Sequence, residues 1–392
     1  MTVKPNVVNS RRQNANLIGH SYLFTKTNIM YQLTNLKNAL ALGLLLSSAG
    51  VWAQGVITTP RNPSPAASVS QTIGISSITV HYSRPSVKGR EIWGKLVPYG
   101  WNVEGFGAGN KAPWRAGANE NTILQLSHPA MIQGHLVPAG DYGLFFTINQ
   151  DNTGEVILSK DSKSWGNFWY DPKLDEMREK ITVRDGPPTE MLTYDFDEIT
   201  HNGAELVLSW EKKQFPVKIE FAVDDIVMAN ATEELKGPVG FSWQGYASAA
   251  AYALQNKVNL EQASRWADVA VQQNNSFATL NLKSGILKEM GKTDEAEKTM
   301  KEALPMATEL ELNNYGYQLL NQKQMDKAID AFILNTQRHP KSPNVWDSLG
   351  EGYAIKGDKK NAIINFKKSL SLNPPPNVKA NSEKYLQQLG AM

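Results

Sequence analysis

Residues 346–370 read WDSLGEGYAIKGDKKNAIINFKKSL, in which apolar and small residues recur at helical spacing. With the residues that follow, the marker positions are Trp346, Leu349, Gly350, Tyr353, Ala362, Phe366 and Pro374. A similar series stands one repeat earlier, at Leu312, Tyr315, Gly316, Leu319, Ala328, Phe332 and Pro340. Alanine recurs over a longer range, at Ala263, Ala296, Ala328 and Ala362, with intervals of 33, 32 and 34 residues. A period of this length indicates an array of helical units.

These positions resemble the signature of the tetratricopeptide repeat (TPR), a unit of two helices about 34 residues long. One helix pair cannot bury its apolar face alone, so neighbours stack, and small residues allow the helices to cross closely. The aromatic and leucine positions are therefore predicted to form the core. We expect an all-α TPR solenoid over residues 245–392, closed by a polar capping helix over residues 377–389.

The resemblance also implies a concave face, lined by particular positions of each first helix. Those positions are Tyr252, Asn281, Asn313, Tyr317, Asp347 and Glu351. We predict that this face binds an extended peptide or a loop of a protein partner. The alternative is a solvated face that merely lengthens the molecule. A basic clamp for a peptide terminus is not expected, because these positions offer asparagines and acids.

Residues 66–223 have a different pattern, in which apolar and polar residues alternate. The alternation is clear in ITVHYS at 78–83, in AELVLSWE at 204–211 and in VKIEFAV at 217–223, and we expect Pro216 to break the chain between the last two runs. The residues predicted to point inward from these two runs are Leu206, Leu208, Trp210, Val217, Ile219 and Phe221. Short strands separated by glycine-rich turns predict an antiparallel β-sandwich or barrel-like domain. One short helix is expected in LDEMREK at 174–180. The whole chain is thus predicted to be an α+β multidomain protein, with a linker over 224–244.

Several motifs of this first domain occur in the same order as in a known family. They are Arg84-Pro85, Lys88-Gly89-Arg90, Pro98-Tyr99-Gly100, Trp114-Arg115, Gly117-Ala118-Asn119, Ala139-Gly140, Trp165-Gly166 and Trp210-Glu211. In this respect residues 66–223 resemble DUF2911, a bacterial domain of unknown function that is frequent in exported proteins of Bacteroidetes. The resemblance implies a β-rich domain and no established activity. Some members run almost directly from PYG to WR, whereas WNVEGFGAGNKAP intervenes here, so we expect the longer loop to alter any adjacent site.

The motifs place arginines close to aromatic residues. The candidate ligand-binding residues are Arg84, Arg90, Trp93, Trp114, Arg115, Asn119, Tyr142 and Trp165. A guanidinium group pairs well with a carboxylate or phosphate, and an aromatic face stacks on a sugar ring. In the alternative interpretation, the arginines bind internal acids or carbonyls and the tryptophans fill the sandwich. The turn glycines and prolines of the motifs favour that alternative.

No catalytic residue, metal ligand or cofactor is predicted. The chain has no cysteine, which excludes disulfides, thiolate nucleophiles and cysteine metal sites. His81, His128, His135 and His201 lack the helical spacing of zinc hydrolases, although zinc or copper binding by histidines on adjacent strands stays open. Scattered acids such as Asp171, Asp175, Glu176, Asp195 and Asp197 would allow a second alternative. That alternative is an envelope or polysaccharide hydrolase with paired carboxylates near the Trp114 loop.

The N-terminal segment has the pattern of a secretory signal peptide. From Met30, a better initiator than Met1, Lys37 precedes an apolar run, and Val51 and Ala53 suit a cleavage site. Residues 1–53 are therefore predicted to be a leader. The mature chain is expected to be periplasmic or secreted, without a lipid anchor or a transmembrane segment.

Removal of the leader changes the sign of the net charge. The 40 basic and 38 acidic residues include five basic and no acidic residues in 1–53, so the mature chain carries about −3. A basic stripe of the kind that binds nucleic acid is missing. Together these features predict a non-enzymatic binding and scaffold protein of the cell envelope. Its β-domain would bind a small anionic or glycan ligand or a partner, and its repeats a protein or peptide.

Overall fold

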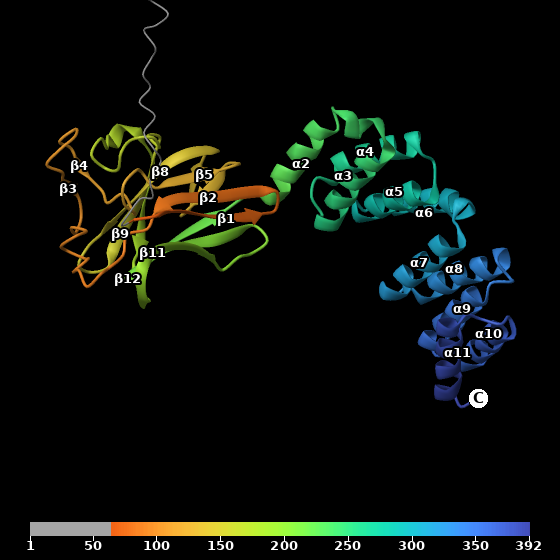
Figure 1. The fold of residues 1–392 in the computed structure, drawn as a ribbon. Helices are drawn as coiled ribbons and strands as arrows, with labels where there is room; N and C mark the ends of the chain where they lie inside the picture. Colours follow the sequence, from red (N-terminus) through yellow and green to blue (C-terminus); the bar gives the residue numbers. More distant parts are fainter. Residues whose placement is uncertain (1–63) are drawn as a thin grey trace, which may run out of the picture. The chain divides into compact units, whose positions relative to one another are not determined.

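The computed structural model describes residues 64–392, so the predicted leader and Met30 lie outside the described residues. An antiparallel β-sheet domain comes first and a TPR-like all-α region follows it (Figure 1). This fold class is the one that the sequence predicts. Among the described residues, no helix has both the length and the apolar character needed to cross a membrane.

The β-domain contains two main antiparallel sheets. The six-stranded sheet has the order β1 (Ala66–Ile73), β2 (Ser76–Ser83), β5 (Ile123–Leu126), β8 (Gly140–Ile148), β9 (Thr153–Ser159) and β10 (Asp175–Thr182). The four-stranded sheet has the order β11 (Arg184–Asp197), β12 (Gly203–Glu220), β6 (Ala130–Ile132) and β7 (His135–Val137). A small hairpin pairs β3 (Asn102–Val103) with β4 (Lys111–Ala112).

The two main sheets share one hydrophobic core. The residues predicted to point inward from residues 204–223 are all buried, namely Leu206, Leu208, Trp210, Val217, Ile219 and Phe221. Ile78, Val80 and Tyr82 of β2 belong to the same cluster of contacts. Alternation with a period of two therefore identified the buried face of both sheets, as expected for strands that are solvated on one side.

The helix predicted at 174–180 is wrong. Only Pro172–Leu174 forms a helical turn, η1, and the chain then continues as β10, which pairs with β9. The charged side chains of this segment favour a helix by local propensity. Pairing with β9 prevails because it buries Met177 and Ile181 against the core.

The break predicted at Pro216 is also wrong, because β12 continues through it to Glu220. Proline cannot donate a hydrogen bond to a neighbouring strand. Its position explains why it is tolerated: the β11 pairing ends at Gln214, and the β6 pairing begins only at Ile219.

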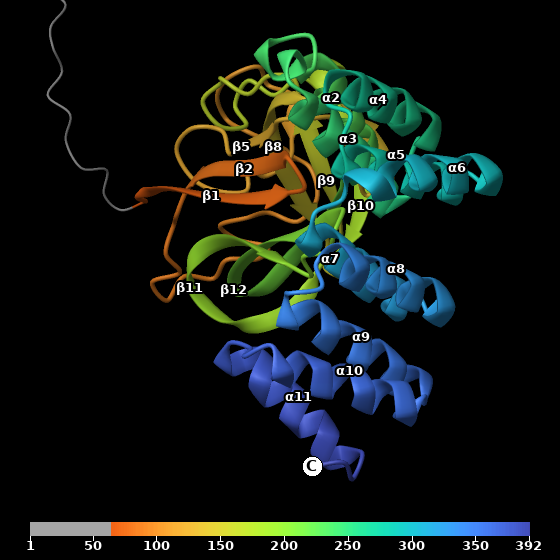
Figure 2. The ribbon, with the colours of Figure 1, turned by 90° about the vertical axis from the view of Figure 1, so that its right-hand side faces the viewer.

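The helical region follows without a long irregular connection. Its helices are α2 (Val223–Glu234), α3 (Trp243–Asn256), α4 (Leu260–Gln273), α5 (Phe277–Glu289), α6 (Thr293–Ala303), α7 (Glu309–Asn321), α8 (Met325–Arg338), α9 (Pro343–Lys356), α10 (Lys359–Ser371) and α11 (Pro376–Gln388). The segment predicted as a linker thus contains α2 and the turn η2 (Pro238–Phe241). Figure 2 shows the later helices as successive packed pairs, with α11 in the place of the predicted capping helix.

The repeat signature has a direct packing explanation. A side chain at Gly316 would place its Cβ 2.3 Å from Phe332, and one at Gly350 would lie 2.9 Å from Phe366. Both phenylalanines are fully buried, so each fills the space that the glycine of the preceding helix leaves open. The recurrent alanines are buried as well, which allows the helices to cross closely.

Candidate functional site

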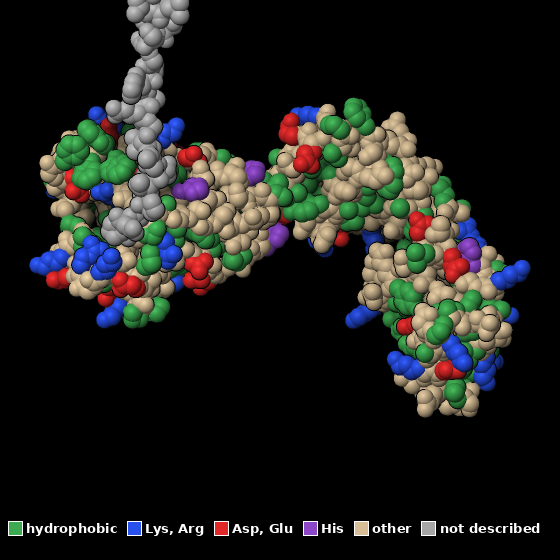
Figure 3. All heavy atoms as spheres, viewed as in Figure 1, with side chains coloured by type: hydrophobic (Ala, Val, Ile, Leu, Met, Phe, Trp, Pro, Cys, Tyr) green, Lys and Arg blue, Asp and Glu red, His purple; other side chains and the backbone are tan. Residues whose placement is uncertain are grey.

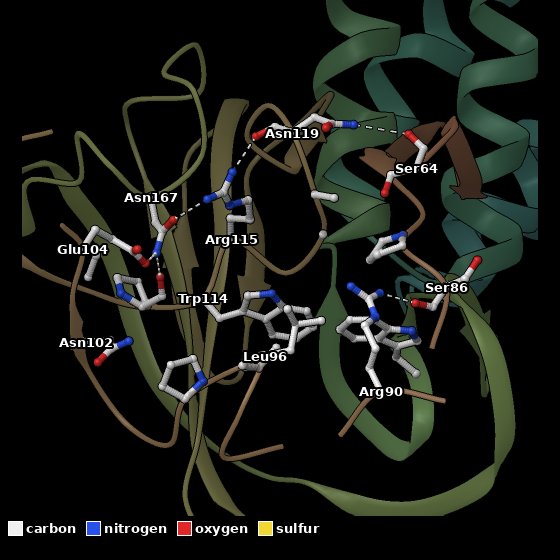
Figure 4. Close-up of a pocket in the computed structure, with 18 of the residues that line it drawn as sticks. Ser64, Ser86, Arg90, Leu96, Asn102, Glu104, Trp114, Arg115, Asn119 and Asn167 are labelled. Carbon is white, nitrogen blue, oxygen red and sulfur yellow. Dashed lines mark hydrogen bonds between the residues drawn. The ribbon is translucent and has the colours of Figure 1, made fainter. Parts of the chain in front are cut away.

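A pocket of about 480 Å³ lies in the β-domain, and several family motifs contribute to its wall (Figure 4). Its polar lining residues are Ser64, Ser86, Lys88, Arg90, Asn102, Glu104, Arg115, Asn119 and Asn167. Apolar side chains, which include Leu96, Trp114 and Trp210, complete the lining. A mixed lining of this size is typical of a small-molecule site.

Half of the predicted ligand-binding residues line this pocket, namely Arg90, Trp114, Arg115 and Asn119. Trp114 is fixed to β8 by two backbone hydrogen bonds with Phe146, of 2.8 and 2.9 Å. Its ring stacks on the buried Trp210, with 5.8 Å between centroids and 16° between planes. The fixed backbone and the stacked partner make Trp114 a rigid aromatic wall.

Arg115 is the best-anchored cation of the pocket. It donates hydrogen bonds to the Asn119 carbonyl (2.8 Å) and to Oδ1 of Asn167 (2.9 Å), and it lies over the Phe168 ring. Burial lowers the pKa of this guanidinium group, and the nearby Glu104 carboxylate opposes that shift. Asn167 joins the two charges, because its Nδ2 donates to Oε1 of Glu104 over 2.7 Å. Arg115 and Glu104 therefore offset each other within one network.

Lys88 and Arg90 are the other two cations of the lining; the backbone N–H of Lys88 donates to Oε1 of Glu190 over 2.9 Å, and Glu190 itself is not among the lining residues. Both cationic side chains are exposed, and among residues 64–392 neither forms an ion pair. Arg90 donates to the carbonyls of Val87 and Ser86, which holds its guanidinium group at the edge of the pocket. Lys88 has a φ of 47° and precedes Gly89, so the chain makes a tight turn here.

The other four predicted residues lie outside the pocket lining. Arg84 donates to the Leu192 carbonyl (3.0 Å) and to Oγ1 of Thr193 (2.6 Å) and so connects its segment to β11. Tyr142 donates to the Pro138 carbonyl. Trp93 packs edge-on against Trp114 and Trp210, and Trp165 is 51% exposed. The alternative interpretation of the motifs, internal pairing and filling of the core, describes Arg84, Tyr142 and Trp93.

Sequence reasoning missed Lys88, Asn102, Glu104, Asn167 and Trp210 as lining residues. A signal existed for Lys88 and Trp210, which stand inside the shared family motifs, and Asn167 directly follows one. Asn102 and Glu104 belong to the longer loop, which we expected to alter an adjacent site. Folding of that loop into the β3–β4 hairpin places both residues in the lining.

The hairpin packs against the segment that carries Asn167. Phe106 lies edge-on to the rings of Phe168 and Trp169, and Ala108 donates to the Phe168 carbonyl over 2.8 Å. Phe106 and Trp169 are exposed, and Figure 3 shows hydrophobic side chains gathered on the surface of the β-domain. The hairpin thus has a defined place beside the pocket.

Gly107 permits this contact, so we expect Gly107→Ala to loosen the hairpin. Its φ is 90°, and a Cβ there would lie 2.0 Å from the Phe168 carbonyl oxygen. Left-handed backbone and overpacking together should lower the free energy of unfolding by about 1–3 kcal/mol. Urea unfolding measures the change. The control is Gly105→Ala, where a Cβ meets open space; an equal loss in both variants would contradict the explanation.

The pocket offers little support for the hydrolase alternative. Among the described lining residues, Glu104 is the only carboxylate, whereas glycoside hydrolysis requires two acids about 5–9.5 Å apart. Three of the four histidines of the β-domain contact other side chains: His81 contacts Gln125, His128 contacts Ser127, and His135 contacts Glu179. Within residues 64–392, no group of three or more His, Asp and Glu side chains is placed to hold a metal ion.

The predicted groove positions of the helical region are partly used in internal contacts. Tyr317 donates to Glu351 over 3.0 Å, which joins α7 to α9. Asp347 is buried and accepts a hydrogen bond from Asn381 of α11 (2.8 Å), and burial raises the pKa of its carboxyl group. Tyr252 donates to Asp224 of α2, and burial with this bond raises the pKa of Tyr252 to about 12.

Asn281 lines a second pocket, of about 490 Å³, formed mainly by α5, α6 and α7. Its apolar and aromatic lining includes Leu282, Met300 and Tyr315. Three lysines also line it, Lys288, Lys301 and Lys327, and Lys327 pairs with Glu297 over 2.9 Å. None of these lysines is among the six predicted groove positions: Lys301 and Lys327 lie on the second helices α6 and α8, and Lys288 lies at the end of α5. Asn313 is not in this lining, and its Oδ1 is buried without a hydrogen bond in the part of the chain that the structure describes.

Comparison with known proteins identifies both regions. Residues 64–219 match the family DUF2911, described as a protein of unknown function, and residues 343–376 match a tetratricopeptide repeat. The chain therefore carries a DUF2911 domain followed by a TPR region. A comparison with curated proteins gave no match.

Solved TPR structures resemble the helical region at low sequence identity. YrrB, described as a TPR protein with an unusual peptide-binding site, is 15% identical, with 41% of this chain and 84% of that chain covered and a TM-score of 0.27. The pilF protein of Pseudomonas aeruginosa is 23% identical, with 39% of this chain and 71% of that chain covered and a TM-score of 0.27. The C-terminal part of a TPR repeat-containing protein from Cytophaga hutchinsonii is 18% identical, with 41% of this chain and 67% of that chain covered and a TM-score of 0.29.

Proposed function

We propose that this chain is an exported, non-enzymatic binding and scaffold protein. Its DUF2911 domain binds a small anionic ligand in the pocket beside Trp114, and its TPR region holds a protein or peptide partner. The signal-peptide pattern of residues 1–53 supports export. The repeat match supports a protein partner, because TPR arrays present extended surfaces for binding.

One observation carries the ligand proposal: cations outnumber acids in the lining of the pocket. Lys88, Arg90 and Arg115 face a single described carboxylate, that of Glu104. Because Arg115 and Glu104 offset each other, Lys88 and Arg90 supply the net positive charge. A bound carboxylate or phosphate would neutralise that charge and accept hydrogen bonds from the guanidinium group.

A thermal-shift panel on the mature chain, residues 54–392, tests this proposal. It contains small carboxylates, inorganic phosphate and neutral sugars. An anion present at 100 times its dissociation constant should stabilise the protein by about 2.7 kcal/mol. We expect the double variant Lys88→Ala, Arg90→Ala to lose the shift and to keep its unfolding temperature without ligand, because both side chains are exposed.

The matched control removes two other exposed cations, with Lys95→Ala and Lys111→Ala. These residues lie close in sequence but are not among those that line the pocket. The control should keep the full ligand shift. A silent panel with wild-type protein, or equal losses in both double variants, would refute anion binding at this pocket.

A further inference from the structure

We infer that the ligand of the DUF2911 pocket is an acidic sugar, whose hydroxyl groups are recognised by the inserted β3–β4 hairpin. This inference rests on the anion binding proposed above and names the class of ligand. It depends on three features of the pocket: its two chemically different sides, the inward face of the hairpin, and the aromatic wall between them.

The two sides of the pocket differ in charge. Figure 4 shows Arg90 and Ser86 on one side, and Asn102, Glu104 and Asn167 on the other. An acidic group is attracted to the side of Arg90, because Arg115 and Glu104 offset each other on the opposite side. A bound acid is therefore oriented, with the rest of the ligand directed toward the hairpin.

The inward face of the hairpin offers hydrogen-bond acceptors. Asn102 of β3 and Glu104, which directly follows that strand, both line the pocket. Val103 between them points away and is 57% exposed. One oxygen of Glu104 accepts from Asn167, and within the described residues its other oxygen has no hydrogen bond. A carboxylate oxygen accepts but cannot donate, so its partner must be an O–H or N–H group.

The wall between the two sides suits a ring. Trp114 lines the pocket and is held by Phe146 and by its stack on Trp210. A sugar ring has an apolar face that packs on an aromatic surface, while its hydroxyl groups point outward from the ring edge. Acid, apolar face and hydroxyl donors occur together in a sugar acid. A simple carboxylate uses only the Arg90 side, and a neutral sugar uses only Trp114 and the hairpin.

Three probes of similar size separate these contributions: methyl β-D-glucuronide, methyl β-D-glucoside and cyclohexanecarboxylate. Isothermal titration of the mature chain gives an affinity for each. The glucuronide should bind about tenfold or more tightly than either of the others, because hydrogen bonds to a charged group add at least this factor. Equal affinity for the glucuronide and cyclohexanecarboxylate would overturn the inference and leave anion binding standing. If no probe binds and inorganic phosphate does not bind either, the proposed function fails as well.

The variant Glu104→Ala tests the role of the hairpin through its different effects on two ligands. It should weaken glucuronide binding about tenfold by loss of the acceptor. It should leave cyclohexanecarboxylate binding unchanged or stronger, because that ligand has no hydroxyl group for the acceptor and the loss of Glu104 leaves the charge of Arg115 without its offset. A merely structural role of Glu104 would weaken both, and that result would contradict the inference.

The control Val103→Ser changes the outward face of the same strand and should leave both affinities unchanged. If Glu104→Ala does not fold, Asn102→Ala replaces it, with the same expected loss for the glucuronide. Undiminished glucuronide binding in the folded variant would overturn the assignment of the hairpin.

Discussion

Replacement of Trp210 by alanine is expected to lower the free energy of unfolding of the β-domain by about 3–5 kcal/mol. Trp210 is 1% exposed and contacts the rings of Trp93 and Trp114 between the two sheets. Its removal leaves a cavity that the fixed backbone of Trp114 cannot close. Urea unfolding followed by near-ultraviolet circular dichroism measures the loss.

The control is Trp165→Ala, a chemically identical change at a side chain that is 51% exposed. We expect a loss below about 1 kcal/mol, as for most surface substitutions. Comparable losses at both positions would show that Trp210 does not anchor the core.

Much of the fold could be predicted because its signals are local and periodic. Alternation identified Leu206, Leu208 and Trp210 as buried, and the repeat period identified the buried alanines of the helical region. The segment 174–180 failed because its local propensity and its tertiary pairing disagree. Nothing within those residues reveals that β9 is their neighbour.

The candidate site was harder to predict, because its residues lie in loops and distant segments. Arg84 and Arg90 look alike in the sequence, yet Arg84 binds the backbone of β11 and Arg90 lines the pocket. A loop has no period that fixes the direction of a side chain. The Arg115–Asn167–Glu104 network also joins three separate segments, and one of them is the inserted hairpin.

In the helical region, Phe332→Ala should have an effect as large as that of Trp210→Ala. Phe332 of α8 is 0% exposed and fills the spaces left by Gly316 of α7 and Gly352 of α9. Its truncation therefore weakens two contacts between helices, and we expect a loss of about 3–5 kcal/mol. Circular dichroism at 222 nm during urea unfolding follows the helices, which contribute most of that signal.

The control Phe241→Ala removes the same atoms from a side chain that is 87% exposed, and it should change the free energy of unfolding by less than about 1 kcal/mol.

Each TPR unit is stabilised mainly by its neighbours, so weakened contacts around α8 should affect α7 and α9 most strongly. Hydrogen exchange should then show faster exchange in α7–α9 and unchanged protection in β8 and β9. Uniform loss of protection in both regions would mean that the repeats and the β-domain unfold as one unit, and the solenoid explanation of Phe332 would be incorrect.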